Sequence, residues 1–189
     1  MRKKDDEKQR CIKIAVMQLI LEEGFQGTSI SKIARAAGVS PATVYIYYEN
    51  KESMLREIYQ EYSEETIQYL LQCISPNMVG EDIIAELIRR YYFFIIENKE
   101  VFHFIEQFST CPVLQSTCRS MKGPAYLNQL LTDLKKRQIL NDFNNDNLYA
   151  FLFSPVKTIA VKSCESEHVA MERLNELIYI IQKALLKDF

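Results

Sequence analysis

The sequence predicts an all-α fold, and three observations support this prediction. Hydrophobic residues make up 48% of the 189 residues, which is enough for a sizeable core and far above a disordered composition. The chain contains only five Gly and five Pro, which leaves little room for the many turns of a β-rich architecture. Apolar residues recur with helical spacing in almost every segment. The length suits one or two small domains.

The first expected element is an amphipathic helix over residues 6–23, which Gly24 ends. Its apolar residues recur at i, i+3, i+4, i+7 and i+8, and we interpret it as the brace of a three-helix domain. The first ten residues are charged, and no solid apolar run follows them as in a signal peptide. The longest apolar run, residues 91–96, is far too short to span a bilayer. We therefore expect a cytoplasmic protein with no membrane partner.

Residues 27–55 predict two short helices joined by a tight turn. Thr28 and Ser29 are candidate N-caps of the first helix. Gly38 suits the left-handed position that follows a helix C-terminus. Ser40 is expected to cap the second helix, with Pro41 at its first position, where the missing N–H would have been unpaired anyway. Helix, glycine turn and short helix is the geometry of a helix-turn-helix DNA reader, although spacing alone also fits a plain helical hairpin within a larger bundle.

The second of these helices has two distinct faces. Val44, Tyr45 and Tyr48 share one face, which we expect to point inward. The opposite face carries Ala42, Thr43, Ile46 and Tyr47. Asn50 then caps the next helix.

The residues themselves favour the DNA-binding interpretation. The segment closely resembles the DNA-binding domain of TetR-family transcriptional regulators, whose pattern T-x4-IA-x2-AGVS-x2-T-[LV]-Y-x-[HY]-[FY]-x2-KE is long and ordered. The resemblance covers about the first third of the chain, and the remainder is similar only in length and helical character. Two positions depart from the usual pattern. Ala42 stands where Gly is frequent, and Ile46 stands where polar or aromatic residues are usual, so readout there would be apolar contact, for example with a thymine methyl.

The resemblance implies a set of DNA contacts. Thr43 and Ala42 would face bases, Tyr47 would donate its hydroxyl to a phosphate, and Lys51 would clamp the backbone together with N–H groups near Thr28. The full expected set is Thr28, Ser29, Ser40, Pro41, Ala42, Thr43, Tyr45, Tyr47, Tyr48 and Lys51. A palindromic operator on double-stranded DNA is the expected target, read by two such heads.

The charge distribution agrees with one local DNA-binding surface. Residues 1–57 carry a net charge of +2, whereas residues 58–189 carry a net charge of −4. Binding by bulk charge alone is therefore not expected, and a basic footprint on an acidic body fits specific duplex binding by one domain.

The remaining segments predict helices over residues 50–72, 81–97, 101–108, 148–164 and 167–187. A further helix would hold Leu114 and Met121 and be kinked or restarted at Gly123 and Pro124. We accordingly expect a helix-turn-helix DNA-binding domain over residues 1–49 and a helical effector-binding and dimerisation domain over residues 50–189. The last two helices resemble in placement the pair that forms the family's four-helix dimer interface, so a homodimer is expected.

The resemblance also implies a small-molecule effector pocket enclosed by the middle helices. The sequence independently gathers aromatic residues there, although each alone also fits an ordinary core position. Their tyrosine content favours apolar walls with a few polar groups, and the nearby Glu97 and Glu106 favour a lipophilic neutral or cationic compound. The predicted pocket residues are Tyr59, Tyr62, Tyr91, Phe94, Phe102, Phe104, Phe108 and Tyr126.

Other functions find little support in the residues. There is no Gly-rich phosphate loop, GxSxG, HExxH or other metal-ligand spacing, so no catalytic residue, metal or cofactor is predicted and an enzyme is not expected. His103, among phenylalanines, is interpreted as a core histidine. A redox pair of Cys111 and Cys118 has no supporting signal. The alternative function is a helical ligand carrier or interaction protein without DNA binding, against which the intact Thr43, Tyr47 and Lys51 argue.

Overall fold

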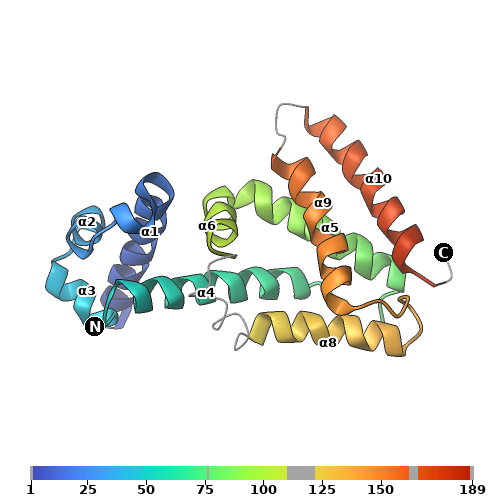
Figure 1. Cartoon of the computed structure of the whole chain (residues 1–189), viewed down its shortest axis with the longest axis horizontal. Coiled ribbons are helices and arrows are strands. Elements are labelled where there is room, and N and C mark those ends of the chain that lie inside the picture. Colours follow the sequence, from blue (N-terminus) through green and yellow to red (C-terminus); the bar gives the residue numbers. More distant parts are fainter. Residues whose placement is uncertain (1, 76, 110–121, 162–165, 188–189) are drawn as a thin grey trace. The chain divides into compact units, whose positions relative to one another are not determined.

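The computed structural model of the chain describes residues 2–75, 77–109, 122–161 and 166–187 (Figure 1). Most of these residues lie in helices, and their only strand-like pairing is an isolated antiparallel bridge between Leu140 and Leu186. The predicted all-α fold is confirmed. The helices are α1 (Arg2–Gly27), α2 (Ile30–Ala36), α3 (Pro41–Tyr47), α4 (Lys51–Leu71), α5 (Gly80–Glu97), α6 (Lys99–Ser109), α8 (Lys122–Lys136), α9 (Asn145–Val161) and α10 (Glu167–Leu185).

Most helix boundaries lie within three residues of their expected positions. The exception is α1, which extends four residues beyond its expected range at each end. The α9 helix begins three residues before its expected start, where the Asn144 side chain accepts a hydrogen bond from the Asp146 N–H at 2.7 Å. Gly123 and Pro124 lie in the first turn of α8. The expected helix around Leu114 and Met121 lies outside the described residues.

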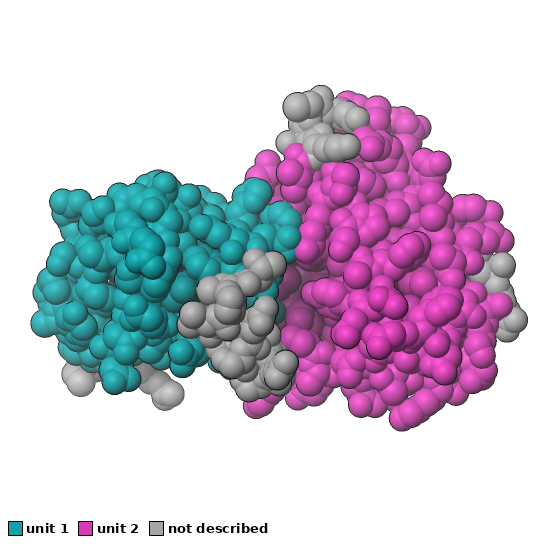
Figure 2. All heavy atoms as spheres, viewed as in Figure 1, with its two compact units in different colours: residues 1–63, 100–120 teal, residues 64–99, 121–189 magenta. Residues whose placement is uncertain are grey.

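The chain divides into two compact units, which Figure 2 colours separately. Unit 1 comprises residues 1–63 and 100–120, and unit 2 comprises residues 64–99 and 121–189. The boundary falls inside α4, between Ser63 and Glu64, so one uninterrupted helix contributes to both units.

The N-terminal part of unit 1 is a small three-helix arrangement in which α2 packs against both α1 and α3. Its centre is formed by fully buried aliphatic side chains, among them Ile12 and Val16 of α1, Ile33 of α2 and Val44 of α3. An ion pair between Lys13 and Glu61 joins α1 to the first half of α4. The amphipathic period of α1 thus supplies the apolar stripe on which the two short helices rest.

Unit 2 is a helical bundle built around α5. This helix buries ten of its residues and packs against α9 and α10, while α8 packs against α9. Its position at the centre of the unit agrees with its sequence, which is apolar on nearly every side. Gln182 of α10 is buried and donates its amide to the Glu81 carbonyl at 2.9 Å, which satisfies a polar group inside this packing.

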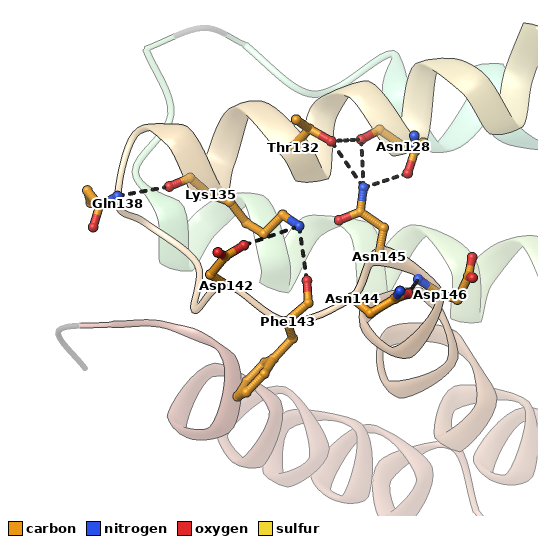
Figure 3. Close-up of polar contacts among 9 residues, drawn as sticks. All are labelled: Asn128, Thr132, Lys135, Gln138, Asp142, Phe143, Asn144, Asn145 and Asp146. Carbon is orange, nitrogen blue, oxygen red and sulfur yellow. Dashed lines mark hydrogen bonds and ion pairs between the residues drawn. The ribbon is translucent and has the colours of Figure 1, made fainter.

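Polar side chains fix the connection between α8 and α9 (Figure 3). The Asn145 amide donates to the Thr132 hydroxyl at 3.0 Å and to the Asn128 side-chain oxygen. Lys135 donates to the Phe143 carbonyl at 3.0 Å and lies 3.6 Å from a carboxylate oxygen of Asp142. These contacts hold the first turn of α9 against α8.

The end of α10 is tied back to the same connection. The Asn141 N–H donates to the Leu185 carbonyl at 2.9 Å, and the Lys187 N–H donates to the Ile139 carbonyl at 3.1 Å. Together they flank the bridge between Leu140 and Leu186, so residues 139–141 and 185–187 pair along a short antiparallel stretch.

Candidate nucleic-acid interface

The entry to α2 is built from a glycine break and two hydroxyl side chains. Gly24 has φ 73° and interrupts α1 at the predicted residue. Ser29 is the N-cap of α2 and accepts the Lys32 N–H at 3.3 Å. Thr28, the other candidate cap, is instead buried and donates its hydroxyl to the Gly24 carbonyl at 2.9 Å. Ser29 therefore caps the helix, whereas Thr28 holds the turn before it.

The turn between α2 and α3 has the conformation that its sequence predicts. Gly38 has φ 66°, a left-handed value that glycine adopts without a steric cost. Its N–H donates to the Arg35 carbonyl at 3.2 Å, and the Val39 N–H donates to the Ala34 carbonyl at 2.9 Å. These two bonds make a Schellman motif, which satisfies the last carbonyls of α2 and turns the chain sharply into α3.

The short helix α3 depends on its cap. The Ser40 hydroxyl accepts the Thr43 N–H at 3.1 Å and lies 2.9 Å from the Thr43 hydroxyl, and Pro41 is the first helical residue. A helix of seven residues is too short to persist alone in water. The cap and the buried Val44 therefore determine whether α3 keeps its shape.

One face of α3 is left open to solvent. Ile46 is 77% exposed and Tyr45 is 57% exposed, Ala42 and Pro41 are also exposed, and Thr43 and Tyr47 are half-buried. An exposed isoleucine on a short, well-anchored helix is a group that can contact a base edge in the major groove.

Two expectations about the tyrosines of α3 are corrected. Tyr45 does not point inward. Val44 is the buried residue of this short helix, whose contact surface with the rest of the domain is too narrow to bury Tyr45 as well. Tyr48 is 3% exposed and cannot contact DNA through its ring. It follows the last residue of α3 with extended backbone angles, φ −136° and ψ 131°, which turn its side chain into the core. Burial raises the pKa of the Tyr48 hydroxyl to about 12, even though a hydrogen bond with the Gln9 side chain opposes this shift.

Two lysines of residues 1–57, the net-positive part of the chain, donate hydrogen bonds to main-chain carbonyls. Lys51 donates to the Phe25 carbonyl at 2.9 Å and to the Thr28 carbonyl at 3.1 Å. Lys32 donates to the Gly27 carbonyl at 3.0 Å and pairs with Glu23. Sequence reasoning missed these contacts, since no local pattern signals which distant carbonyl a lysine reaches.

Five of the predicted effector residues belong to unit 1. Tyr59, Phe102, Phe104 and Phe108 are buried, and the Tyr62 ring meets the Phe104 ring edge-on with centroids 6.0 Å apart. Phe104 also lies 5.3 Å from Phe108. The structure therefore brings Tyr62, Phe104 and Phe108 together as one aromatic cluster. Ser63, which was not predicted, is buried, and its hydroxyl has no hydrogen-bond partner among the described residues.

The other three predicted effector residues belong to unit 2. Tyr91 is buried with its ring 5.0 Å from that of Phe153, and Phe94 is buried with its ring 6.2 Å from that of Tyr69. Tyr126 is 60% exposed and shares no ring contact with them among the described residues. His103, expected in the core, is exposed.

The outward faces of α9 and α10 carry exposed apolar side chains. The larger ones are Tyr149, Phe151 and Val161 on α9 and Tyr179 and Ile180 on α10. A groove of about 310 Å³ lies on this part of unit 2, and it is lined by Phe143, Asn147, Leu148, Phe151, Ala184 and Leu185. Exposed apolar area of this kind is typical of a protein–protein interface.

The described residues contain no group of three or more His, Cys, Asp or Glu side chains that could hold a metal ion. Among the same residues, no helix is long and apolar enough to cross a membrane. Cys111 and Cys118 lie outside the described residues.

Comparison with known proteins adds independent information. Residues 15–58 match the family "Bacterial regulatory proteins, tetR family". The chain is 30% identical over 78 residues to the fatty acid metabolism regulator protein of Bacillus subtilis. The aligned residues make up 41% of this chain and 40% of that protein. The chain thus aligns with less than half the length of this relative.

Solved structures extend the likeness to the whole chain. A TetR family transcription regulator from Marinobacter aquaeolei superposes with a TM-score of 0.83 at 25% identity, over 99% of this chain and 100% of that one. The transcriptional regulator FadR from Bacillus subtilis, crystallised in complex with stearoyl-CoA, superposes with a TM-score of 0.71 at 19% identity, over 91% of this chain and 96% of that one.

Proposed function

Because the chain belongs to the TetR family of bacterial transcriptional regulators, we propose that it is a repressor that binds a palindromic operator as a homodimer and is released by a small lipophilic effector. The observation that carries the DNA-binding part is the open face of α3, where Ile46 and Tyr45 are exposed on a helix that Ser40, Gly38 and Val44 hold in place. Such a protein would act in the cytoplasm, where the chromosome lies, and would not be an enzyme.

In this proposal α3 enters the major groove. Ala42 permits close approach, Thr43 and Ile46 face the bases, and Tyr47 donates to a phosphate. Pro41 and Tyr45 would lie at the edges of the same surface. Residues 1–49 would read the DNA, and residues 50–189 would bind the effector and dimerise.

The homodimer is supported by the apolar outward face of α9 and α10. One reading head contacts about one half-site, which is too little for high specificity, and a two-fold axis supplies the second half-site. Exposed aromatic and aliphatic residues on two adjacent helices, such as Tyr179, Ile180 and Phe151, are what a four-helix interface would cover.

The effector is proposed to contact the aromatic cluster of Tyr62, Phe104 and Phe108 in unit 1. Apolar walls with a few polar groups are typical of sites for lipophilic ligands. The Ser63 hydroxyl would be such a polar group, since a buried hydroxyl is stabilised when it gains a hydrogen-bond partner.

Two effector classes are to be distinguished. Glu97 and Glu106, which lie close in the sequence to these aromatic residues, favour a neutral or cationic compound. A fatty acid derivative is the second class, because one relative is named a fatty acid metabolism regulator and another was crystallised with stearoyl-CoA. The effector would act by population shift, binding better to a conformer whose α4 is displaced and whose reading heads no longer match the operator spacing.

The test of this function begins with selection of bound duplexes from a random-sequence pool, followed by screening of lipophilic cations, neutral compounds and acyl-CoAs for DNA release. Recovery of a palindrome and release by one class are expected. Phe104→Ala should weaken effector binding. Phe93→Ala is the control and should not, because Phe93 is 37% exposed. If no duplex is enriched, the chain is better described as a helical ligand carrier. If ligands stabilise the protein but never change its DNA affinity, the coupling is wrong.

A further inference from the structure

Two consecutive residues of α4 contact different helices of unit 1. Glu61 forms an ion pair with Lys13 of α1. Tyr62 meets the Phe104 ring of α6 edge-on, with ring centroids 6.0 Å apart. Neighbouring residues of a helix point about 100° apart, so one turn can hold partners on two sides. This turn of α4 therefore joins the aromatic cluster of Tyr62, Phe104 and Phe108 to α1, the helix on which the reading head of α1, α2 and α3 is built.

The Lys13 side chain is only 17% exposed, which is unusual for a lysine, and that of Glu61 is 42% exposed. Water and salt therefore screen this pair less than a fully exposed one. Ile12, the neighbour of Lys13 in α1, is fully buried in the core that α1 forms with α2 and α3. Because a close-packed core transmits strain, a displacement of Lys13 would move the reading helix together with α1.

A second contact joins the same region of α4 to the end of α3. Tyr48 directly follows α3 and is buried, and its hydroxyl forms a hydrogen bond with the Gln9 side chain of α1. Burial raises the pKa of this hydroxyl to about 12, and the Glu61 carboxylate lies near enough to add to the shift. Gln9 and Lys13 share one face of α1, since residues four apart are neighbours on a helix surface. Glu61 therefore lies beside both α1 and the residue that follows the reading helix.

We propose that Glu61 is the positioning residue that couples the aromatic cluster to the reading head, through its ion pair with Lys13. The inference rests on the proposed function, in which an effector contacts this cluster and weakens DNA binding. A compound that enters between Tyr62 and Phe104 has to separate two rings that are in contact, and so displaces the turn of α4 that carries Tyr62. Glu61 moves with this turn, and the ion pair transfers the displacement to α1. Without the pair, the cluster and the reading head rearrange independently.

The experiment measures this coupling independently of any effector. Phe104→Leu is the perturbation at the cluster, because it removes one of the touching rings but keeps an apolar side chain. It is introduced into the wild type and into two variants that break the pair. Glu61→Ala removes the carboxylate and keeps a strong helix former in α4, and Lys13→Met keeps an unbranched stem but removes the ammonium.

Glu57→Ala is the matched control. Glu57 is an exposed residue one turn before Glu61, and its carboxylate lies near the Tyr48 hydroxyl, as that of Glu61 does. It forms no ion pair among the described residues. Two readouts are taken for each protein. Affinity is measured for a duplex that the wild type selects from a random pool, and amide hydrogen exchange of residues 9–16 is measured without DNA.

In the wild type and in Glu57→Ala, Phe104→Leu is expected to change DNA affinity by about 3- to 30-fold and to alter exchange of residues 9–16, as substitutions within a coupled network do. In Glu61→Ala and in Lys13→Met, the same substitution should change DNA affinity by less than about twofold and leave exchange unaltered. Breaking the pair alone should keep DNA affinity within about twofold of the wild type and make exchange of residues 9–16 about two- to fivefold faster, as loss of a partly exposed ion pair would do. The double variant Lys13→Met/Glu61→Ala should behave like either single variant, because the pair acts as one unit.

An equal effect of Phe104→Leu in the wild type and in Glu61→Ala, including no effect in either, would show that no coupling passes through Glu61 and would overturn the proposal. Loss of the coupling in Glu57→Ala would overturn it too, by assigning the effect to carboxylate charge on α4 and not to the pair. If Glu61→Ala does not fold, Lys13→Met decides. Failure of the wild type to select any duplex would count against DNA binding itself. Exchange of residues 9–16 would then decide the coupling, because only an intact pair lets Phe104→Leu alter it.

Discussion

Replacing Ser40 with alanine tests whether the reading helix depends on its cap. Ser40→Ala removes the acceptor of the Thr43 N–H and the neighbour of the Thr43 hydroxyl. Loss of such a cap costs about 1 kcal/mol, within a range of about 0.5–2. The upper part of that range is expected because α3 has only seven residues and no long helix to absorb fraying at its start.

A matched control lies in unit 2. Ser166 caps α10 in the same way, but its hydroxyl is 3.5 Å from the Val169 N–H and the helix has 19 residues. Ser166→Ala should therefore cost less, and it should leave DNA affinity unchanged. For a chain of this size, about 1 kcal/mol corresponds to a decrease in Tm of about 2–4 °C. If fraying of α3 accounts for the whole loss, DNA affinity should fall by no more than about 30-fold, which corresponds to about 2 kcal/mol.

Ser40→Asp separates the cap from the DNA contact. Aspartate is as good an N-cap as serine, so stability should stay within about 0.5 kcal/mol of the wild type. Its charge would face the phosphates, so DNA binding should weaken more than in Ser40→Ala, and the deficit should shrink in high salt. Thermal melts followed by circular dichroism and fluorescence anisotropy with the selected duplex provide both readouts. A stable Ser40→Asp variant that binds as tightly as the wild type would refute the placement of α3 at the DNA.

Four further predictions follow from single residues. Burial raises the pKa of Tyr48 in the folded protein to about 12 from 10.0, so burying its neutral form contributes stability below pH 10, and this contribution is lost as the pH rises from 10 to 12. In Tyr48→Phe, the free energy of unfolding measured in urea should therefore fall less steeply over this pH range than in the wild type. Gln138 follows α8 in a left-handed conformation with φ 62°. Gln138→Gly should remove about 1 kcal/mol of backbone strain and raise Tm by about 2–4 °C. A lower Tm would show that the lost side-chain contacts of Gln138 stabilise the fold by more than this strain costs. Ser63→Ala should stabilise the effector-free protein by about 1 kcal/mol in thermal melts and weaken effector binding; unchanged effector affinity would exclude Ser63 from the site. Ile180→Glu should convert a dimer into monomers in sedimentation, and a wild type that is already monomeric at micromolar concentration would contradict the assembly.

The reading head was predictable because its signals are local. The caps Ser29 and Ser40 and the left-handed Gly38 each act within four residues of their own position, so sequence order alone specifies them. The central role of α5 was predictable for a related reason, since a helix that is apolar on nearly every side can only be buried.

The errors concern side chains whose surroundings depend on distant segments. Tyr48 shares a helical face with Val44 in an ideal projection, and this face correctly indicated that Tyr48 is buried. The error was to include Tyr48 among the DNA contacts that the family resemblance implies. Tyr45 was misplaced because a seven-residue helix touches its domain along a narrower strip than a long helix does. The carbonyls that Lys51 reaches lie 23 and 26 residues away, and no periodicity reports such a contact.

The pairing of residues 139–141 with residues 185–187 joins the two ends of the segment that contains α9 and α10, so this segment forms a closed ring. Each end of that ring is secured by main-chain hydrogen bonds, and the Asn141 amide adds contacts to the Ala184 and Leu186 carbonyls. Cutting the backbone between the two helices would open the ring without freeing either anchored end. The protein is therefore suited to division into two fragments at this point, with α10 as a small peptide that can be supplied separately and recaptured, as in split reporters.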